Sequence, residues 1–193
     1  VGHSWGAMLA YIFAARFPAL IKKIILVGSG AFAGKYAAGI METRLSRLNA
    51  GETKEAIDLL AALNDPAVPG KDALFLRFGS LCTKADCFDP ITLDTGVAAC
   101  CYHVHAQVWR DAEKLRTDGL LLELGKQIRQ GLTAIHGDYD PHPAAGVEIP
   151  LASVLANFKF FLLPHCGHYP WLERQAREMF FEILKKELRI GDK

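Results

Sequence analysis

Ser4 lies between two glycines in the stretch Gly2-His3-Ser4-Trp5-Gly6, and this spacing could support nucleophilic chemistry. It is typical of a nucleophile elbow, a sharp strand-to-helix turn that holds one serine in a strained backbone conformation. We expect glycine at both flanking positions because a Cβ atom at either would collide across the turn. A serine held in this way is a candidate nucleophile, provided that a base contacts its hydroxyl group.

Candidates for that base and for its partner lie far along the chain. Asp138 and Asp140 belong to a turn after one apolar run, and His168 belongs to a loop after another. An imidazole titrates near neutrality, so His168 can take the serine proton and return it to a leaving group. An aspartate can hold that imidazole in one tautomer, and the backbone N–H of Trp5 can donate to a developing oxyanion.

Each of these residues also has an ordinary structural interpretation. Ser4 alone would be a helix N-cap, Asp138 and Asp140 would be turn formers, and His168 would be a loop residue. Together they occur in the order serine, aspartate, histidine, each just after the end of a predicted strand. Open α/β sheets place their sites at that edge, so the combination favours a catalytic triad with either aspartate as its acid.

The remaining histidines near these motifs are weaker candidates. We interpret His136, before the acid turn, and His165, on the loop before the base, either as structural residues or as residues that support the catalytic ones without touching substrate. His3 is adjacent to the nucleophile and is expected to help hold the elbow. His142 lies in the acid turn, and its position indicates no role.

The elements that must position these residues form an α/β pattern. A helix is expected from about residue 5 to 17, ending at Pro18, and an amphipathic helix from about 171 to 188. Continuous aliphatic runs are typical of strands buried on both faces, and hence of a parallel sheet. These runs predict about three strands, at 22–28, 132–136 and 158–163.

The segment from 35 to 128 contains no strand-like run. Helical periodicity recurs in it at about 36–49, 52–64, 71–82 and 97–128. We therefore predict an all-helical insertion, which is either a lid over a pocket or a plain packing subdomain. The expected division is 1–34 for the first part of the core, 35–128 for the helical cap and 129–193 for the rest of the core.

Composition excludes several classes of function. Among 193 residues, 51% are hydrophobic and 22% charged, and the formal net charge is +1. Nucleic-acid binding normally leaves a basic footprint, and no apolar stretch is long enough for a membrane span. Five cysteines at irregular spacing are typical of reduced thiols in a cytoplasmic protein. The stretch 100–105 holds two cysteines and two histidines, but its spacing matches no zinc pattern, so no metal or other cofactor is expected.

Three motifs together resemble the α/β-hydrolase superfamily: the stretches 2–6, 135–141 and 166–173. In that family the acid follows a G-x-x-D pattern, which selects Asp140, and the base lies in a G-H-x-P-type turn, which selects His168. The resemblance implies an α/β fold with a helical cap and a serine nucleophile. Such enzymes include esterases, peptidases and C–C hydrolases acting on small molecules, and Trp5 with the cap resembles proline iminopeptidase-like members. A hydrolase-like protein that binds a ligand without turnover is the alternative from another class.

The chain departs from the family because only Val1 precedes the elbow, where a full hydrolase has several strands and a second oxyanion donor. We therefore expect the C-terminal portion of a hydrolase, with weak activity or none on its own. The strand at 22–28 would lose its neighbour and expose an edge. That edge predicts self-association, or pairing with the missing N-terminal part.

Overall fold

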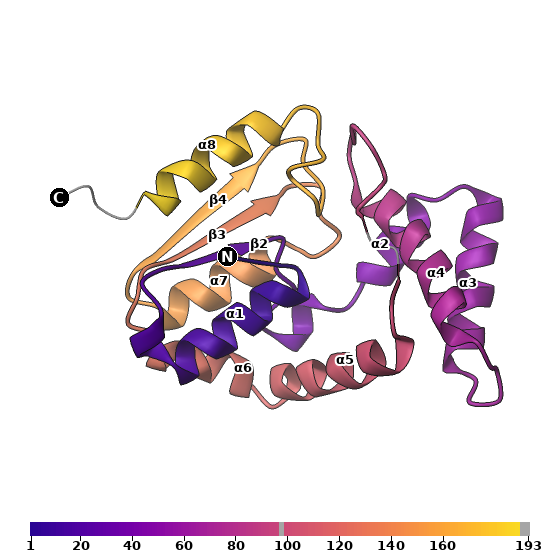
Figure 1. Ribbon diagram of the computed structural model, residues 1–193, viewed down its shortest axis with the longest axis horizontal. Coiled ribbons are helices and arrows are strands. Elements are labelled where there is room, and N and C mark those ends of the chain that lie inside the picture. The colour runs from indigo at the N-terminus through magenta and orange to yellow at the C-terminus, as the bar shows by residue number, and fades with distance from the viewer. Residues whose placement is uncertain (97–98, 190–193) are drawn as a thin grey trace.

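The computed structural model describes residues 1–96 and 99–189, and its centre is a parallel sheet (Figure 1). The strands lie side by side in chain order, each parallel to the next. They are β1 (Gly2–His3), β2 (Ile24–Val27), β3 (Leu132–Gly137) and β4 (Phe158–Leu163). The parallel α/β fold is confirmed, with a short fourth strand in addition to the three expected.

The extra strand β1 corrects two expectations about the start of the chain. Gly2 pairs with Leu26, and His3 pairs with Val27, so a short strand does deliver Ser4. The strand β2 therefore keeps a neighbour over its second half, where we expected a wholly unpaired edge. The reason is that a parallel ladder needs only backbone groups, so two extended residues before the elbow suffice to form one.

Helices cover both faces of the sheet (Figure 1). Helices α1 (Trp5–Arg16) and α7 (Ala145–Val154) lie on one face, and α8 (Arg177–Leu188) lies on the other. Successive side chains of β2 alternate between the two faces, as the pleat requires. Ile24 and Leu26 join the cluster under α1 and α7, whereas Ile25 and Val27 join the cluster under α8.

Two helices on the sheet differ from the sequence-based expectation. The stretch that forms α7 is mostly apolar without a clear helical period and contains Pro150, so the sequence gave no helical signal there. The last helix begins at Arg177 and not near residue 171. Residues 171–176 form turns instead, and the Glu173 backbone oxygen accepts from Arg177 N at 3.0 Å where the helix begins.

Between β2 and β3 the described residues form helices, as predicted, but in shorter pieces that are joined by non-helical stretches such as 87–96 and 99–101. The helices are α2 (Ile40–Ser46), α3 (Ala50–Asn64), α4 (Lys71–Asp86), α5 (Tyr102–Thr117) and α6 (Leu120–Glu123), with 3₁₀ turns at Gly34–Tyr36 and Leu124–Gln127. A further 3₁₀ turn, Pro18–Leu20, lies between α1 and β2. The expected helix over 97–128 divides at Gly119, whose φ of +73° ends α5, and its positions 97–98 lie outside the described residues. None of the helices in the described ranges combines the length and the apolar character that crossing a bilayer requires.

These helices separate into two groups by packing. Helices α2, α3 and α4 share a hydrophobic cluster of their own around Leu63, Phe78 and Leu81. Helices α5 and α6 instead contribute Ala112 and Leu121 to the core under α1. In Figure 1 the first group stands beside the sheet, while α5 and α6 lie below it. The part of the segment that stands apart from the core is therefore α2–α4.

Candidate active site

Ser4 occupies the turn between β1 and α1 with a strained backbone. Its φ is 53° and its ψ is −121°, a positive φ that non-glycine residues rarely adopt. Its backbone N–H donates to Val27 O at 3.0 Å, and its backbone oxygen accepts from Ala7 N at 3.0 Å. The turn is thus fixed by β2 on one side and by α1 on the other.

The two flanking glycines of the elbow behave differently. A Cβ atom at Gly2 would lie 2.1 Å from Gly6 O, so glycine is required there, as predicted. A Cβ atom at Gly6 would meet nothing within 4 Å outside its own helix. The predicted collision is therefore wrong for Gly6, because this residue belongs to the first turn of α1 and faces open space.

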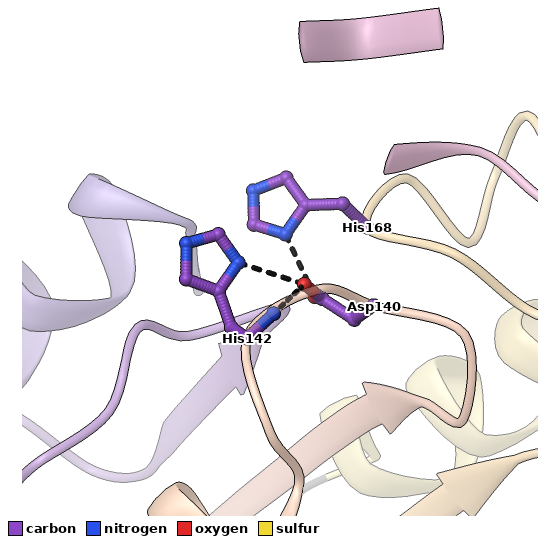
Figure 2. Close-up of side chains that lie close together, drawn as sticks. All are labelled: Asp140, His142 and His168. Carbon is purple, nitrogen blue, oxygen red and sulfur yellow. Dashed lines mark hydrogen bonds and ion pairs between the residues drawn. The ribbon is translucent and has the colours of Figure 1, made fainter. Parts of the chain in front are cut away.

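An acid–base pair lies at the carboxyl ends of β3 and β4. His168 Nδ1 donates to Asp140 Oδ2 at 2.7 Å, and the two residues are only 3% and 6% exposed (Figure 2). Of the two candidate acids, Asp138 has a different partner, since its Oδ1 accepts from Cys166 N at 3.1 Å. Asp140 therefore contacts the imidazole, while Asp138 fastens the loop that carries it.

The electrostatics of the pair favour a charged acid and a more basic imidazole. Burial would raise the pKa of Asp140, but His168 and His136 and the hydrogen bonds from His142 and His168 more than offset this, holding that pKa well below its usual value. Burial would lower the pKa of His168, yet the charge of Asp140 and its hydrogen bond raise it above the ordinary histidine value. An imidazole with a raised pKa is a stronger base once it is deprotonated.

Gly28, directly after β2, permits the close approach of this pair. Its φ is +51°, and a Cβ atom there would lie 2.8 Å from His168 O, 3.2 Å from His168 Nδ1 and 3.4 Å from Asp140 Oδ2. Any larger residue would push the histidine loop away from β2. The sequence analysis assigned no role to Gly28, and its place at the end of a predicted strand was the available signal.

The backbone of His168 is held from two sides. Its N–H donates to Asp86 O at 2.8 Å, at the end of α4, and its oxygen accepts from His3 Nε2 at 2.9 Å. The rings of His3 and His168 have centroids 4.7 Å apart. Burial is the main cause that lowers the pKa of His3 to about 4, so this imidazole stays neutral near pH 7 and donates one N–H. His3 thus joins the elbow to the loop of the base.

Glu173 fastens the same loop to the end of α4. This carboxylate is fully buried and accepts backbone N–H groups from Phe88, Asp89 and Gly167, each at 2.8 Å. A buried carboxylate costs free energy unless it is hydrogen-bonded, and three donors satisfy it here. Glu173 stands in one of the three motifs, but sequence reasoning gave it no role.

The structure brings some predicted residues together and leaves others apart. Trp5 is the first residue of α1, directly after Ser4, so its N–H has no acceptor within the helix. Within residues 1–96 and 99–189, no hydrogen bond joins the Ser4 hydroxyl to His168. His165 is exposed and packs near Phe88, with ring centroids 5.2 Å apart.

Two histidines surround Asp140 in addition to His168. His142, to which the sequence assigned no role, donates from Nδ1 to Asp140 Oδ1 at 2.7 Å. His136 donates from Nε2 to His142 O at 2.7 Å and is fully buried. In the described ranges, the side chains of Asp140, His142 and His168 form the one group close enough to share a metal ion, and the cysteine- and histidine-rich stretch 100–105 does not form another.

Several solved structures resemble this fold at low sequence identity, which shows the fold alone. An alpha/beta fold family hydrolase from Bacillus anthracis superposes with a TM-score of 0.62 at 17% identity, covering 96% of this chain and 65% of that one. VinJ gives a TM-score of 0.61 at 16% identity, covering 96% and 64%. The proline iminopeptidase of Mycobacterium smegmatis gives 0.54 at 14% identity, covering 96% and 64%. The chain thus spans less than two thirds of these structures.

No curated protein matches the sequence. The sequence pattern described as "Alpha/beta hydrolase family" matches residues 1–180, which is nearly the whole chain. The match includes the elbow, the acid turn and the histidine loop. The chain therefore belongs to the alpha/beta hydrolase family.

Proposed function

We propose that this protein is a serine hydrolase of small ester, amide or related acyl substrates, with Ser4 as nucleophile, His168 as base and Asp140 as acid. The observation that carries the proposal is the buried hydrogen bond of 2.7 Å between His168 Nδ1 and Asp140 Oδ2. It is supported by the positive φ of 53° at Ser4, at the end of the neighbouring strand β1. An imidazole held through Nδ1 keeps Nε2 unprotonated and ready to accept a proton.

The first half of the proposed reaction forms an acyl-enzyme. Ser4 Oγ attacks the acyl carbon while its proton passes to His168 Nε2, so a C–O bond forms as the O–H bond breaks. The negative charge that develops on the acyl oxygen is met by the N–H of Trp5 at the start of α1. His168 then gives its proton to the leaving alcohol or amine, and the bond to that group breaks.

The second half repeats the same steps with water. His168 takes a proton from a water molecule whose oxygen attacks the acyl carbon, and the proton returns to Ser4 Oγ as the acid departs. Asp140 stays ionised throughout, and its charge stabilises the imidazolium that forms twice in each cycle. Its pKa, lowered by the surrounding histidines despite burial, supports that role.

In this reaction the helices α2–α4 would form a lid over the reacting groups. Arg44 of α2 forms a bidentate ion pair with Asp86 of α4, with both N–O distances 2.7 Å. The backbone oxygen of Asp86 accepts from His168 N, and Glu173 binds the residues that follow α4. The lid and the base would thus share one rigid support, which would set the walls of a substrate pocket against the reacting groups.

We expect the 193 residues on their own to turn over slowly. The strand β1 that delivers Ser4 is two residues long, and Trp5 is the oxyanion donor that we can assign. Loss of one such donor costs about 10²–10³ in kcat. A serine with little strand support would lose more through misalignment.

Hydrolysis of a short-chain p-nitrophenyl ester tests the proposal. We expect slow but measurable release of p-nitrophenol that Ser4→Ala abolishes. Ser80→Ala, which removes a hydroxyl that bonds Leu76 O on exposed α4, is the matched control and should leave the rate unchanged. A Ser4→Ala variant as fast as wild type would overturn the proposal.

A second substrate set separates the alternatives. Amino-acid β-naphthylamides would be preferred by an aminopeptidase, and p-nitrophenyl esters by an esterase. A protein that binds such ligands without converting any of them would instead be a binding module, contrary to the proposal.

A further inference from the structure

Asp140 carries a second imidazole that the proposed triad does not use. His142 Nδ1 donates to Asp140 Oδ1 at 2.7 Å, the same length as the bond from His168 to Oδ2 (Figure 2). The backbone N–H of His142 also donates to Oδ1, at 2.9 Å. Both rings converge on one carboxylate, and their centroids lie 4.8 Å apart.

The second imidazole is itself fixed in place. His142 is 6% exposed, and its backbone oxygen accepts from His136 Nε2 at 2.7 Å. His136 also approaches the acid, with Nε2 3.7 Å from Asp140 Oδ2. Its Nδ1 has no hydrogen-bond partner within the described residues, so the bond from Nε2 to the His142 oxygen is what fixes this ring. A donor to His142 therefore holds the turn that presents His142 to the acid.

Hydrogen bonds to both carboxylate oxygens restrict Asp140 more than a bond to one of them would. A carboxylate bound through one oxygen can rotate about χ2 and tilt away from its partner, because that torsion is soft. Donors on both oxygens restrict the rotation, since turning the group would break the bonds from the His142 imidazole and backbone N–H to Oδ1, and the imidazole is the donor that a substitution can remove. The acid then offers Oδ2 to His168 in one orientation.

We propose that His142 is a positioning residue that locks Asp140 so that the acid holds His168 in its reactive orientation. It acts through Asp140 and does not touch substrate. This inference rests on the proposed function, because the base that it orients is the base of that reaction. His142 would then affect turnover, and substrate binding would be unchanged.

Two variants of equal size isolate the hydrogen bond. In His142→Asn the side-chain nitrogen reaches the position of Nδ1 and can donate to Asp140 Oδ1, whereas the isosteric His142→Leu cannot. Both remove the ring, so their difference reports the donor alone. We expect kcat to fall about 10- to 100-fold in His142→Leu at an unchanged KM, because a hydrogen bond to a charged group is lost. His142→Asn should keep kcat within about threefold of wild type.

Proton NMR of the wild type gives a readout that needs no turnover. Two strongly downfield imidazole protons are expected, one from His142 Nδ1 and one from His168 Nδ1. His142→Asn should remove the first and leave the second unshifted, whereas His142→Leu should shift or broaden the second. Should His142→Leu fail to fold, the wild-type spectrum still decides, because a single downfield imidazole proton would overturn the proposal.

The inference can fail independently of the proposed function. Equal kcat values for the Asn and Leu variants, with the downfield proton of His168 unchanged in both, would show that His142 only fills space. A His142→Leu variant as inactive as His168→Ala would assign a direct role in the reaction to His142 and also overturn the positioning role. Loss of the proposed function itself would appear elsewhere, as Ser4→Ala hydrolysing at the wild-type rate.

Discussion

The acid–base side of the candidate site is held by more hydrogen bonds than the nucleophile side. Asp140 has a donor on each carboxylate oxygen, and His168 is held through its ring, its N–H and its carbonyl oxygen. Ser4 follows a strand of two residues, and its hydroxyl has no hydrogen-bond partner in the described part of the chain. One side is fixed by many contacts, and the other by the backbone of a single turn.

This difference follows from the elements that carry the residues. The proposed acid and base are residues of two loops, and loops keep a geometry only if hydrogen bonds replace the missing secondary structure. The elbow holds Ser4 through φ and ψ, with β2 and α1 as supports. We therefore expect changes on the acid–base side to act through hydrogen bonds, and changes at the elbow to act through steric fit.

The largest effect is expected from the acid. Asp140→Asn should lower kcat about 10⁴-fold, because an amide favours the wrong tautomer of His168. Asp138→Asn is the matched control, since that side chain accepts from Cys166 N and not from the imidazole. The rate of labelling by a fluorophosphonate measures both, and equal losses in the two variants would erase the distinction between the two aspartates.

Alanine substitutions at the two glycines of the elbow test the steric fit on the nucleophile side. Gly2→Ala should destabilise the fold by about 2–4 kcal/mol, because its Cβ would lie 2.1 Å from Gly6 O. Gly6→Ala should be neutral or stabilise by about 0.5–1 kcal/mol, since it adds a better helix former with open space around it. Urea unfolding of both variants measures the change in the free energy of unfolding. A Gly6→Ala variant less stable than Gly2→Ala would contradict this steric explanation.

The pH profile should report the acid–base side. The pKa of His168 is raised, so the base becomes protonated at a higher pH than a free histidine, and kcat/KM should fall below a midpoint that lies above 6.5. Below that midpoint the loss is about tenfold per pH unit. A rate profile between pH 5 and pH 9 measures the midpoint. An acid limb below the ordinary histidine pKa would contradict the assigned hydrogen bond.

Glu187 offers a smaller test, far from the chemistry and at the opposite ends of the strands. This buried carboxylate pairs with Lys23 and Lys159 and accepts from Thr133 Oγ1 at 3.0 Å. Burial would raise its pKa, but these partners lower it to about 2. Because the folded-state pKa is lowered, the stabilisation is present above pH 4.5 and is lost as the pH falls toward 2.

Glu187→Gln should therefore destabilise the protein by about 1–3 kcal/mol at pH 7 with little change in kcat. Thermal unfolding at pH 7 and at pH 3 checks it. The difference between wild type and variant should shrink at the lower pH, and a difference that grows there would contradict the direction of the pKa shift.

The smallest effect expected is weak self-association on the nucleophile side. The outer face of α1 and the turn after it expose Leu9, Phe13, Phe17 and Leu20 by 39–71%, and β1 is the edge of the sheet. A groove of about 430 Å³ beside β1 is lined by Val1, Trp171 and Phe181 among others. Unpaired edges and apolar patches favour association with a second copy. Light scattering should show dimers that Phe13→Ser weakens, and a stable monomer at high concentration would remove this prediction.

Sequence patterns predicted the elements with strong signals. The aliphatic run at 158–163 forms β4 with those bounds, and α1 covers nearly all of its predicted range. Hydrophobic content and a proline define these elements locally, so no tertiary contact is needed to find them. Helix α7 was not predicted because its apolar stretch lacks helical periodicity and contains Pro150. Packing on the sheet decides its structure.

The candidate site divides in the same way. The motif containing Ser4 and the order of serine, aspartate and histidine were visible in the sequence, because the chemistry dictates their types. The contact of His142 with Asp140 was not, since two residues of separation in a turn fix neither side chain's direction. The need for glycine at position 28 depends on a loop about 140 residues away, and only the folded chain reveals that approach.

Covalent labelling is the sharpest test of whether Ser4 is a nucleophile activated by His168 and Asp140. The wild-type protein is treated with a fluorophosphonate, and its intact mass and the labelled peptide are measured by mass spectrometry. We expect one adduct, on the peptide that contains Ser4. It should be absent from Ser4→Ala, and labelling should be much slower in His168→Ala and Asp140→Asn. An adduct on another residue, or labelling of Ser4 at the same rate without His168, would contradict it.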